Sequence, residues 1–163
     1  MAIYSDRKLM DLVDRGMIIS ENFSKDSLTP NGYDLRIDLI RLPGMDDLAE
    51  AEIPPMTFFH VSTLEFINMP GDAIGEIWIR STYARKGLIA SFGAVDSGFH
   101  GNLTLSFFNA SQSYIALTRG ERIAQIIFHS TDQEVEKKYM ERSGNYQDSR
   151  GIITESKNHD IFQ

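Results

Sequence analysis

The chain has 163 residues, of which 42% are hydrophobic and 24% charged, proportions typical of a single globular domain rather than a disordered or fibrous protein. It contains no cysteine, which excludes a disulfide scaffold, a thiol nucleophile and a cysteine-ligated zinc site. The net charge of −7 argues against a nucleic-acid polymer as the main partner. No apolar run is long enough for a membrane helix, and the acidic N-terminal segment is unlike a targeting peptide, so we expect a cytoplasmic protein.

The first pattern along the chain predicts a short helix over residues 5–15. Ser5 is a residue type that caps helix N-termini, and Leu9 and Leu12 are spaced so that they share one helix face. Gly16 follows as a typical C-terminal stop. We therefore expect one helix before the first strand.

From Tyr33 onward, short runs of alternating hydrophobic and polar residues predict β-strands separated by turn-forming residues. The strands are expected over residues 34–40, 58–61, 65–67, 75–79, 103–108, 114–117 and 123–128. Many short strands with few helices indicate a mainly β fold of the jelly-roll or barrel type. Residues 131–163 are polar, and we expect them to form the C-terminal tail of a single domain that spans residues 1–163. This tail is either mobile or becomes ordered only when a ligand binds.

Three cations and two hydroxyl groups lie together in residues 80–87, which have the sequence Arg-Ser-Thr-Tyr-Ala-Arg-Lys-Gly. Hydroxyl and guanidinium groups bind phosphate oxygens, so this segment is a candidate phosphate site. It lacks the G-x-x-x-x-G-K pattern of a Walker loop. The alternative is a solvated turn between strands, and composition does not decide between the two.

Several single residues have both a functional and a structural interpretation. Asp96 follows a short apolar stretch, where a carboxylate either acts as a general base or bonds its own turn. Gln125 lies in an apolar strand, so its amide either completes the structure or contacts a ligand. Tyr139 and Tyr146 either stack on a base or cover the core. Trp78 is expected in the core, and the histidines, which lack metal-ligand spacing, are expected at surface or edge positions.

A set of motifs in fixed order resembles the superfamily of dCTP deaminases and trimeric dUTPases. The motifs are Pro30-Asn31-Gly32-Tyr33-Asp34-Leu35-Arg36, Ser62-Thr63-Leu64-Glu65-Phe66, Arg80-Ser81-Thr82-Tyr83-Ala84-Arg85, Val95-Asp96-Ser97-Gly98-Phe99-His100-Gly101-Asn102, Gly120-Glu121-Arg122-Ile123-Ala124-Gln125 and Asn145-Tyr146-Gln147. The N-terminal helix and the Arg-Ser-x-x-Ala-Arg form are more similar to the deaminase branch. The resemblance implies a distorted jelly-roll, a homotrimer with active sites shared between neighbouring subunits, and a deoxyribonucleoside triphosphate bound with Mg²⁺.

The resemblance also implies which residues bind the triphosphate. Ser81, Thr82, Arg85 and Gln125 match positions that hold phosphates, and Arg80 matches a position that supports their loop. The metal is held mainly by the triphosphate, without a direct protein ligand.

Further roles follow from the same resemblance. Asp96 falls near the sugar, where a dUTPase uses it to activate the attacking water. Phe99 falls under the deoxyribose, where its ring disfavours a 2′-hydroxyl, and Asp34 is a candidate to orient a metal-bound water. The remaining substrate-binding positions that we expect are Thr104, Ser106, Tyr139, Asn145, Tyr146 and Ser149, of which the last four belong to a tail that closes over the ligand.

The sequence departs from the deaminase pattern in ways that bear on the reaction. Ser106 stands where deaminases have a proton-shuttling glutamate, and a serine cannot replace a carboxylate directly. The stretch between Arg85 and Asp96, which carries the base-reading hairpin, is shorter than usual, and Asn145 and Ser149 stand where deaminases commonly have Lys and Gln. These departures favour a hydrolase that converts dUTP to dUMP and pyrophosphate. Deamination of dCTP is the alternative, and a nucleotide-binding paralogue without turnover is the third hypothesis.

Overall fold

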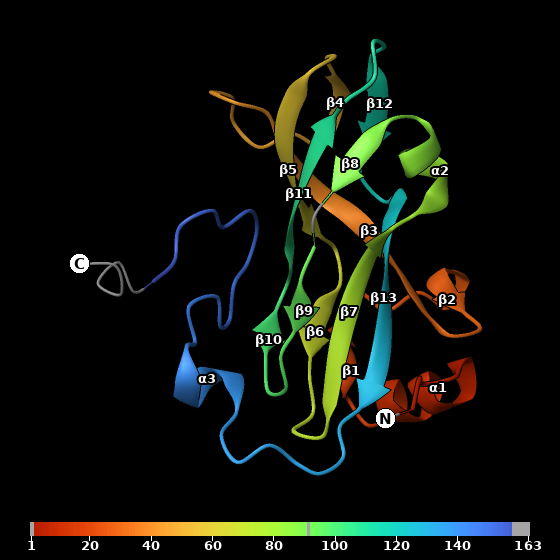
Figure 1. Cartoon of the computed structure of the whole chain (residues 1–163), viewed down its shortest axis with the longest axis vertical. Helices are drawn as coiled ribbons and strands as arrows, with labels where there is room; N and C mark the ends of the chain where they lie inside the picture. The colour runs from red at the N-terminus through yellow and green to blue at the C-terminus, as the bar shows by residue number, and fades with distance from the viewer. Residues whose placement is uncertain (1, 91, 158–163) are drawn as a thin grey trace.

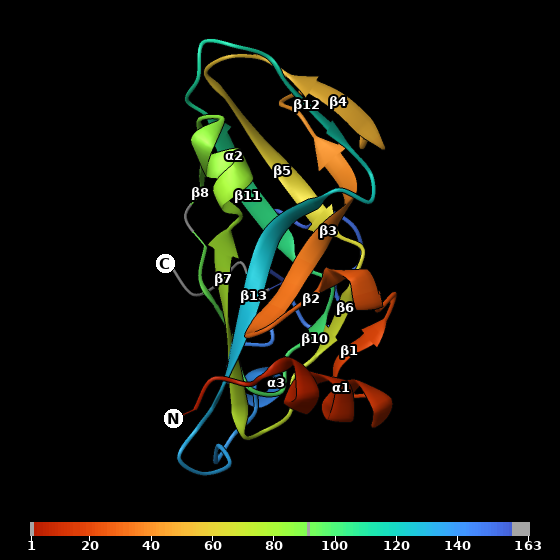
Figure 2. The same cartoon turned by 90° about the vertical axis from the view of Figure 1, so that its right-hand side faces the viewer.

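Antiparallel strands are the main secondary structure over residues 2–90 and 92–157, which are the residues that this computed structural model describes (Figure 1). The largest sheet has the strand order β8-β11-β5-β3-β13-β7-β9, with β2 paired to β3. Figure 2 shows this sheet curling between the β4–β12 pair at one end and α1 with β1 at the other. Within the described residues, no helix is both long and apolar enough to cross a membrane.

The elements have the following bounds. The largest sheet contains β2 (Leu28–Thr29), β3 (Gly32–Arg41), β5 (Thr57–Thr63), β7 (Ala73–Ile79), β8 (Leu88–Ala90), β9 (Ala94–Val95), β11 (Thr104–Asn109) and β13 (Arg122–Ser130). The smaller sheets contain β1 (Ile18–Glu21), β6 (Phe66–Asn68) and β10 (His100–Gly101), and β4 (Glu50–Ile53) with β12 (Ile115–Thr118). The helices are α1 (Asp6–Asp14), α2 (Ser81–Arg85) and α3 (Tyr139–Arg142), with a 3-10 turn over Lys25–Ser27.

The predicted mainly β fold with a short N-terminal helix is confirmed. The hydroxyl of Ser5 caps α1 by accepting a hydrogen bond from the Lys8 N–H at 3.4 Å, and Leu9 and Leu12 are buried. Each predicted strand is present, with boundaries that differ by no more than two residues. The strands that sequence patterns did not predict, among them β4, β8, β9 and β10, have only two to four residues, which is too short for a hydrophobic period.

Aromatic side chains, some of them from neighbouring strands, fill the core. Phe59 of β5 and Phe107 of β11 stack with ring centroids 5.4 Å apart, and both are almost fully buried together with Tyr33 and Phe128. Burial of such a side chain stabilises the fold by roughly 1.5–3 kcal/mol. The prediction that Trp78 lies in the core is wrong, because this residue points outward from β7 and is 58% exposed.

A buried carboxylate joins the start of β3 to the turn after β5. Glu65 is fully buried and accepts hydrogen bonds from the Tyr33 hydroxyl at 3.2 Å, the Arg36 backbone N–H at 2.9 Å and Arg36 Nε at 2.7 Å. Burial raises the pKa of Glu65, and the hydrogen bonds and charge of Arg36 oppose that rise. A buried charge with these partners fixes how the two segments pack, so we interpret Glu65 as a structural residue.

The C-terminal tail is docked against the rest of the domain. After α3 it runs back beside β10 and β11 (Figure 1). The Asp148 N–H donates to the His100 carbonyl at 2.7 Å, and the Asp148 carboxylate lies 2.6 Å from His100 Nδ1. Within the predicted tail, residues 131–163, the segment around Asp148 therefore packs against β10, and residues 158–163 lie outside the described residues.

Candidate functional site

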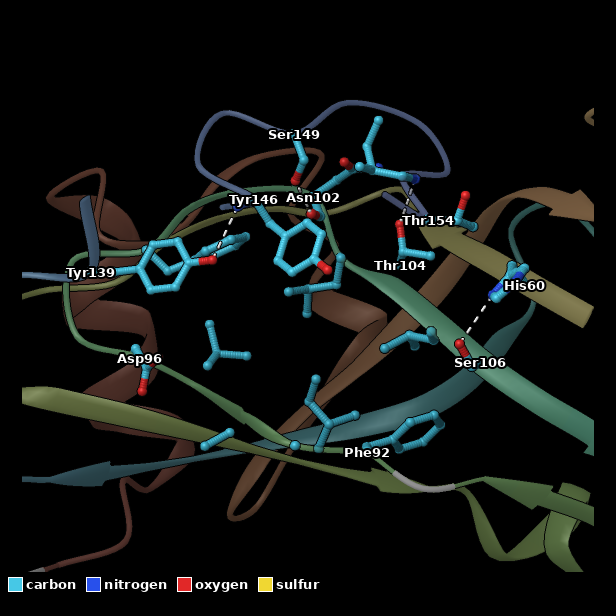
Figure 3. Close-up of a pocket in the computed structure, with 18 residues that line it drawn as sticks. His60, Phe92, Asp96, Asn102, Thr104, Ser106, Tyr139, Tyr146, Ser149 and Thr154 are labelled. Carbon is cyan, nitrogen blue, oxygen red and sulfur yellow. Dashed lines mark hydrogen bonds between the residues drawn. The ribbon is translucent and has the colours of Figure 1, made fainter. Parts of the chain in front are cut away.

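A pocket of about 370 Å³ lies between β11, the segment around β9 and the tail (Figure 3). This volume is within the range of small-molecule sites. The pocket brings together predicted site residues that come from three separate parts of the chain: Asp96, Phe99, Thr104, Ser106, Tyr139, Tyr146 and Ser149. Their convergence makes this pocket the candidate active site.

One side of the pocket is the edge of β11 over residues 104–106, which have no strand partner opposite β5 among the described residues. β5 pairs with all of Thr104–Asn109, whereas β8 pairs on the other side only with residues 107–109. The Leu103 carbonyl accepts from the Thr63 N–H at 2.9 Å, so residue 103 bonds toward the β5 side. Because the bonding direction alternates along a strand, the backbone N–H and C=O groups of Thr104 and Ser106 point away from β5, toward the pocket edge.

A histidine that sequence analysis placed at a surface or edge position lies inside this site. His60 of β5 is directly opposite Ser106 of β11, and its Nδ1 lies 3.0 Å from Ser106 Oγ. Burial lowers the pKa of His60, and the positive charge of Arg41 lowers it further. The sequence predicts the two strands that carry His60 and Ser106, but it does not predict the register that places these residues opposite each other. His129, also expected at the surface, is buried on β13.

The opposite end of the pocket carries the candidate general base. Asp96 follows β9, and its exposed carboxylate reaches the pocket (Figure 3). Phe99 is buried behind it and packs edge-on against Tyr139, with ring centroids 5.5 Å apart. The backbone of Phe99 also donates to the Asp96 carbonyl at 3.1 Å, so a tight turn positions both residues. This arrangement gives an accessible carboxylate beside an aromatic wall.

The tail forms another wall of the pocket. The Tyr146 N–H donates to the Tyr139 hydroxyl at 3.1 Å, and Ser149 Oγ donates to the Asn102 carbonyl at 2.8 Å. Thr104 Oγ1 accepts from the Ile153 N–H at 2.9 Å. The predicted tail residues Tyr139, Tyr146 and Ser149 therefore reach the site in one chain.

Asn145 lies apart from these tail residues, because it is not among the residues that line the pocket. Its side-chain oxygen is buried without a hydrogen-bond partner among the described residues. Sequence analysis missed other residues that do line the pocket, including Asn102, Ile153 and Thr154. Their positions follow from the path of the tail, which has no local signature.

The predicted phosphate-binding residues form a second cluster on another face of the chain. Arg80 Nε lies 3.0 Å from the Asp34 carboxylate, and Arg80 Nη1 donates to the Arg122 carbonyl at 2.9 Å, which holds the start of α2 against the sheet. Burial raises the pKa of Asp34, and the charges of Arg80 and Arg122 oppose that rise. Gln125 Nε2 donates to Thr29 Oγ1 at 2.8 Å. The exposed residues of this cluster are Ser81, Thr82 and Arg85.

One chain does not bring the two clusters together. None of the predicted phosphate-binding residues is among those that line the pocket. Figure 1 shows α2 at the upper right and the tail with α3 at the lower left. A ligand in the pocket of this chain therefore does not contact the phosphate cluster of the same chain.

Two carboxylates, Asp34 and Asp96, belong to the candidate site residues. Among the residues that the structure describes, no group of three or more His, Asp or Glu side chains is placed to hold a metal ion. Asp34 is engaged by Arg80 and Arg122, and Asp96 is the only carboxylate among the described pocket residues. Magnesium often binds through few carboxylates and several phosphate oxygens.

Comparison with known proteins identifies close relatives. Residues 38–131 match a family model described as dCTP deaminase-like. A dCTP deaminase of Thermococcus kodakarensis is 42% identical, over 88% of this chain and 94% of the relative. A dCTP deaminase of Thermococcus gammatolerans is 41% identical, over 83% and 87%. A protein of Aquifex aeolicus named as a dUMP-forming dCTP deaminase is 32% identical, over 93% and 92%.

Solved structures support the fold. The 2′-deoxycytidine 5′-triphosphate deaminase of Agrobacterium tumefaciens superposes with a TM-score of 0.68 at 20% identity, covering 77% of this chain and 48% of that chain. The EIAV dUTPase superposes with a TM-score of 0.50 at 24% identity, covering 73% and 88%. The predicted distorted jelly-roll of dUTPase type is thus confirmed as a fold.

Proposed function

Since this chain belongs to the dCTP deaminase-like family, we propose that it deaminates dCTP to dUTP and releases ammonia. One observation carries this proposal: relatives with 41–42% identity over most of both chains are named dCTP deaminases. Sequence analysis favoured dUTP hydrolysis over dCTP deamination because Ser106 stands in place of a glutamate, and this proposal reverses that order. Hydrolysis of dUTP becomes the second candidate.

The open edge of β11 supports a pyrimidine ligand. The N–H and C=O groups of Ser106 offer one donor and one acceptor to the edge of a base. A pyrimidine ring bound there lies beside the side chains of Ser106 and His60, and its sugar extends toward Phe99. Packing of the sugar on the Phe99 ring disfavours a 2′-hydroxyl.

The separation of the two clusters supports a shared site. A nucleotide in the pocket needs cationic partners for its triphosphate, and in this chain Ser81, Thr82 and Arg85 lie on another face. We propose a homotrimer in which α2 of a neighbouring subunit supplies them. Mg²⁺ bound to the triphosphate would neutralise part of its charge. Trp78 of β7 and Ile89 of β8, the strands before and after α2 in the chain, are exposed and offer apolar area for such contacts.

A specific observation favours dUTP hydrolysis as the second candidate. Asp96 presents an exposed carboxylate to the pocket, where it can activate a water. The Aquifex aeolicus relative is named as dUMP-forming, which requires loss of pyrophosphate as well as of ammonia. Asp96 would serve that step.

A product assay tests the proposed function. The protein is incubated with Mg²⁺ and either dCTP or dUTP, and ammonia and pyrophosphate are measured separately. Ammonia from dCTP is the expected result. Pyrophosphate from dUTP without ammonia from dCTP would favour hydrolysis instead. Binding of either nucleotide without product would leave the non-catalytic paralogue.

A further inference from the structure

Two polar side chains on neighbouring strands form a hydrogen-bonded pair within the pocket. Ser106 Oγ lies 3.0 Å from His60 Nδ1, and both residues line the cavity (Figure 3). Building on the proposed deamination, we propose that the Ser106–His60 pair is the proton-transfer group that activates water for attack on the cytosine ring. The pair would occupy the role for which this chain has no carboxylate on β11.

The reaction requires a group that takes up a proton and gives it back. Water adds across the C4=N3 bond, forming a C4–O bond and an N3–H bond. Elimination then breaks the C4–N4 bond, forms C4=O and moves the hydroxyl proton to N4, which leaves as ammonia. The sum is dCTP plus water giving dUTP plus ammonia, and the proton carrier ends unchanged. A group with a pKa near the working pH serves this cycle best.

Other titratable groups of the pocket are less suited to that cycle. Asp96 lies at the opposite end of the cavity from Ser106 (Figure 3). The Tyr139 hydroxyl accepts a hydrogen bond from the Tyr146 N–H at 3.1 Å, within the wall that the tail forms. Among the described residues that line the pocket, His60 is the only imidazole.

The geometry of the pair gives the path of the proton. When the Ser106 hydroxyl donates to Nδ1, the neutral imidazole of His60 carries its proton on Nε2. Ser106 Oγ then accepts a proton from the attacking water as its own proton passes to Nδ1. The reverse transfer delivers that proton to the ring or to the leaving amine. Ser106 thus contacts the reacting water, and His60 acts through Ser106.

The surroundings keep the imidazole neutral and ready to accept a proton. Burial and the charge of Arg41 hold the pKa of His60 below its ordinary value. Arg41 faces His60 from β3 and is ion-paired with Asp47 at 2.5 Å. Phe58, on the same strand as His60, lies edge-on to the imidazole with ring centroids 4.9 Å apart. The residue of β11 that faces His60 is Ser106. The active, neutral form therefore persists to pH values below about 6.5.

The test compares His60→Gln with a matched histidine variant. H60Q retains a hydrogen-bonding side chain but cannot carry the proton, so kcat for ammonia release from dCTP should fall by about 10²-fold or more. The affinity for dCTP, measured by calorimetry, should be retained. H129Q makes the same change on β13, outside the pocket, and should keep both the wild-type kcat and the wild-type affinity for dCTP. The kcat of the wild-type protein should show an acid limb that matches the NMR titration of His60 and that H60Q lacks.

A rescue experiment separates proton transfer from a structural effect. The double variant H60Q/S106E places a carboxylate on β11 that can carry the proton itself, so ammonia release should rise well above that of H60Q. Wild-type ammonia release with an unchanged rate and acid limb in H60Q would overturn the pair while leaving deamination standing. A loss in H60Q that Ser106→Glu does not restore, with H60Q binding dCTP normally, would also overturn it. Absence of ammonia from the wild-type protein would refute deamination and the pair together.

Discussion

Removal of the buried Glu65 carboxylate should destabilise the protein by about 3–5 kcal/mol, which is the range for breaking a buried ion pair. In Glu65→Ala, the Tyr33 hydroxyl and the Arg36 backbone N–H each lose an acceptor. A buried polar group without a partner costs roughly 1–3 kcal/mol. The Arg36 side chain is 21% exposed, so its charge can partly regain water, which moves the expected value toward the lower end of the range.

Urea unfolding measures this effect, with all variants compared at one protein concentration because the proposed trimer would also contribute to stability. The matched control is Glu21→Ala, which breaks the pair between Glu21 and Arg150, whose side chains are 45% and 67% exposed. Its unfolding midpoint should stay close to the wild type. The folded fraction of E65A should retain the wild-type turnover. An E65A midpoint equal to that of E21A would refute the structural role, and selective loss of turnover would point to a catalytic one.

Three further predictions concern assembly, phosphate binding and hydrolysis. Light scattering at micromolar concentration should give the mass of a trimer, and the mass of one subunit would contradict the shared site. Arg85→Ala should weaken binding of dCTP and dUTP alike by about 2 kcal/mol, because a phosphate contact carries no information about the base, and calorimetry would show a base-dependent loss if this is wrong. Asp96→Asn should abolish any pyrophosphate release from dUTP while nucleotide binding persists, and unchanged release would remove Asp96 from the mechanism.

The sequence predicted the parts of the fold that have a local sequence signature. Alternating hydrophobic residues located the longer strands, and the Ser5 cap located α1. Strand pairing has no such local signature in the sequence. His60 and Ser106 are 46 positions apart, and only the register of β5 against β11 makes them neighbours. The prediction of Trp78 in the core failed for a related reason, because residue type does not say which face of β7 a neighbour will cover.

The candidate site was predictable as a list of residues but not as an arrangement. Motif order named Asp96, Arg85 and Gln125 as candidate functional residues. These residues divide between the pocket and a distant cluster because α2, which follows β7, lies far from the tail (Figure 1). A sequence records the order of such segments, whereas their distance depends on the curl of the sheet between them.

The two ends of the pocket explain how one bound nucleotide can meet two kinds of chemistry. C4 of a pyrimidine and the α-phosphorus lie on opposite sides of the deoxyribose. The Ser106–His60 pair and Asp96 likewise lie at opposite ends of the cavity (Figure 3). Phe99 lies next to Asp96, because its N–H donates to the Asp96 carbonyl. In the proposed binding mode, a nucleotide with its base beside β11 directs its phosphates toward Asp96 and out of the pocket, where α2 of the proposed neighbouring subunit would bind them. Deamination and pyrophosphate release then require no repositioning of the substrate, so loss of one activity by mutation at either end should leave binding and the other activity intact.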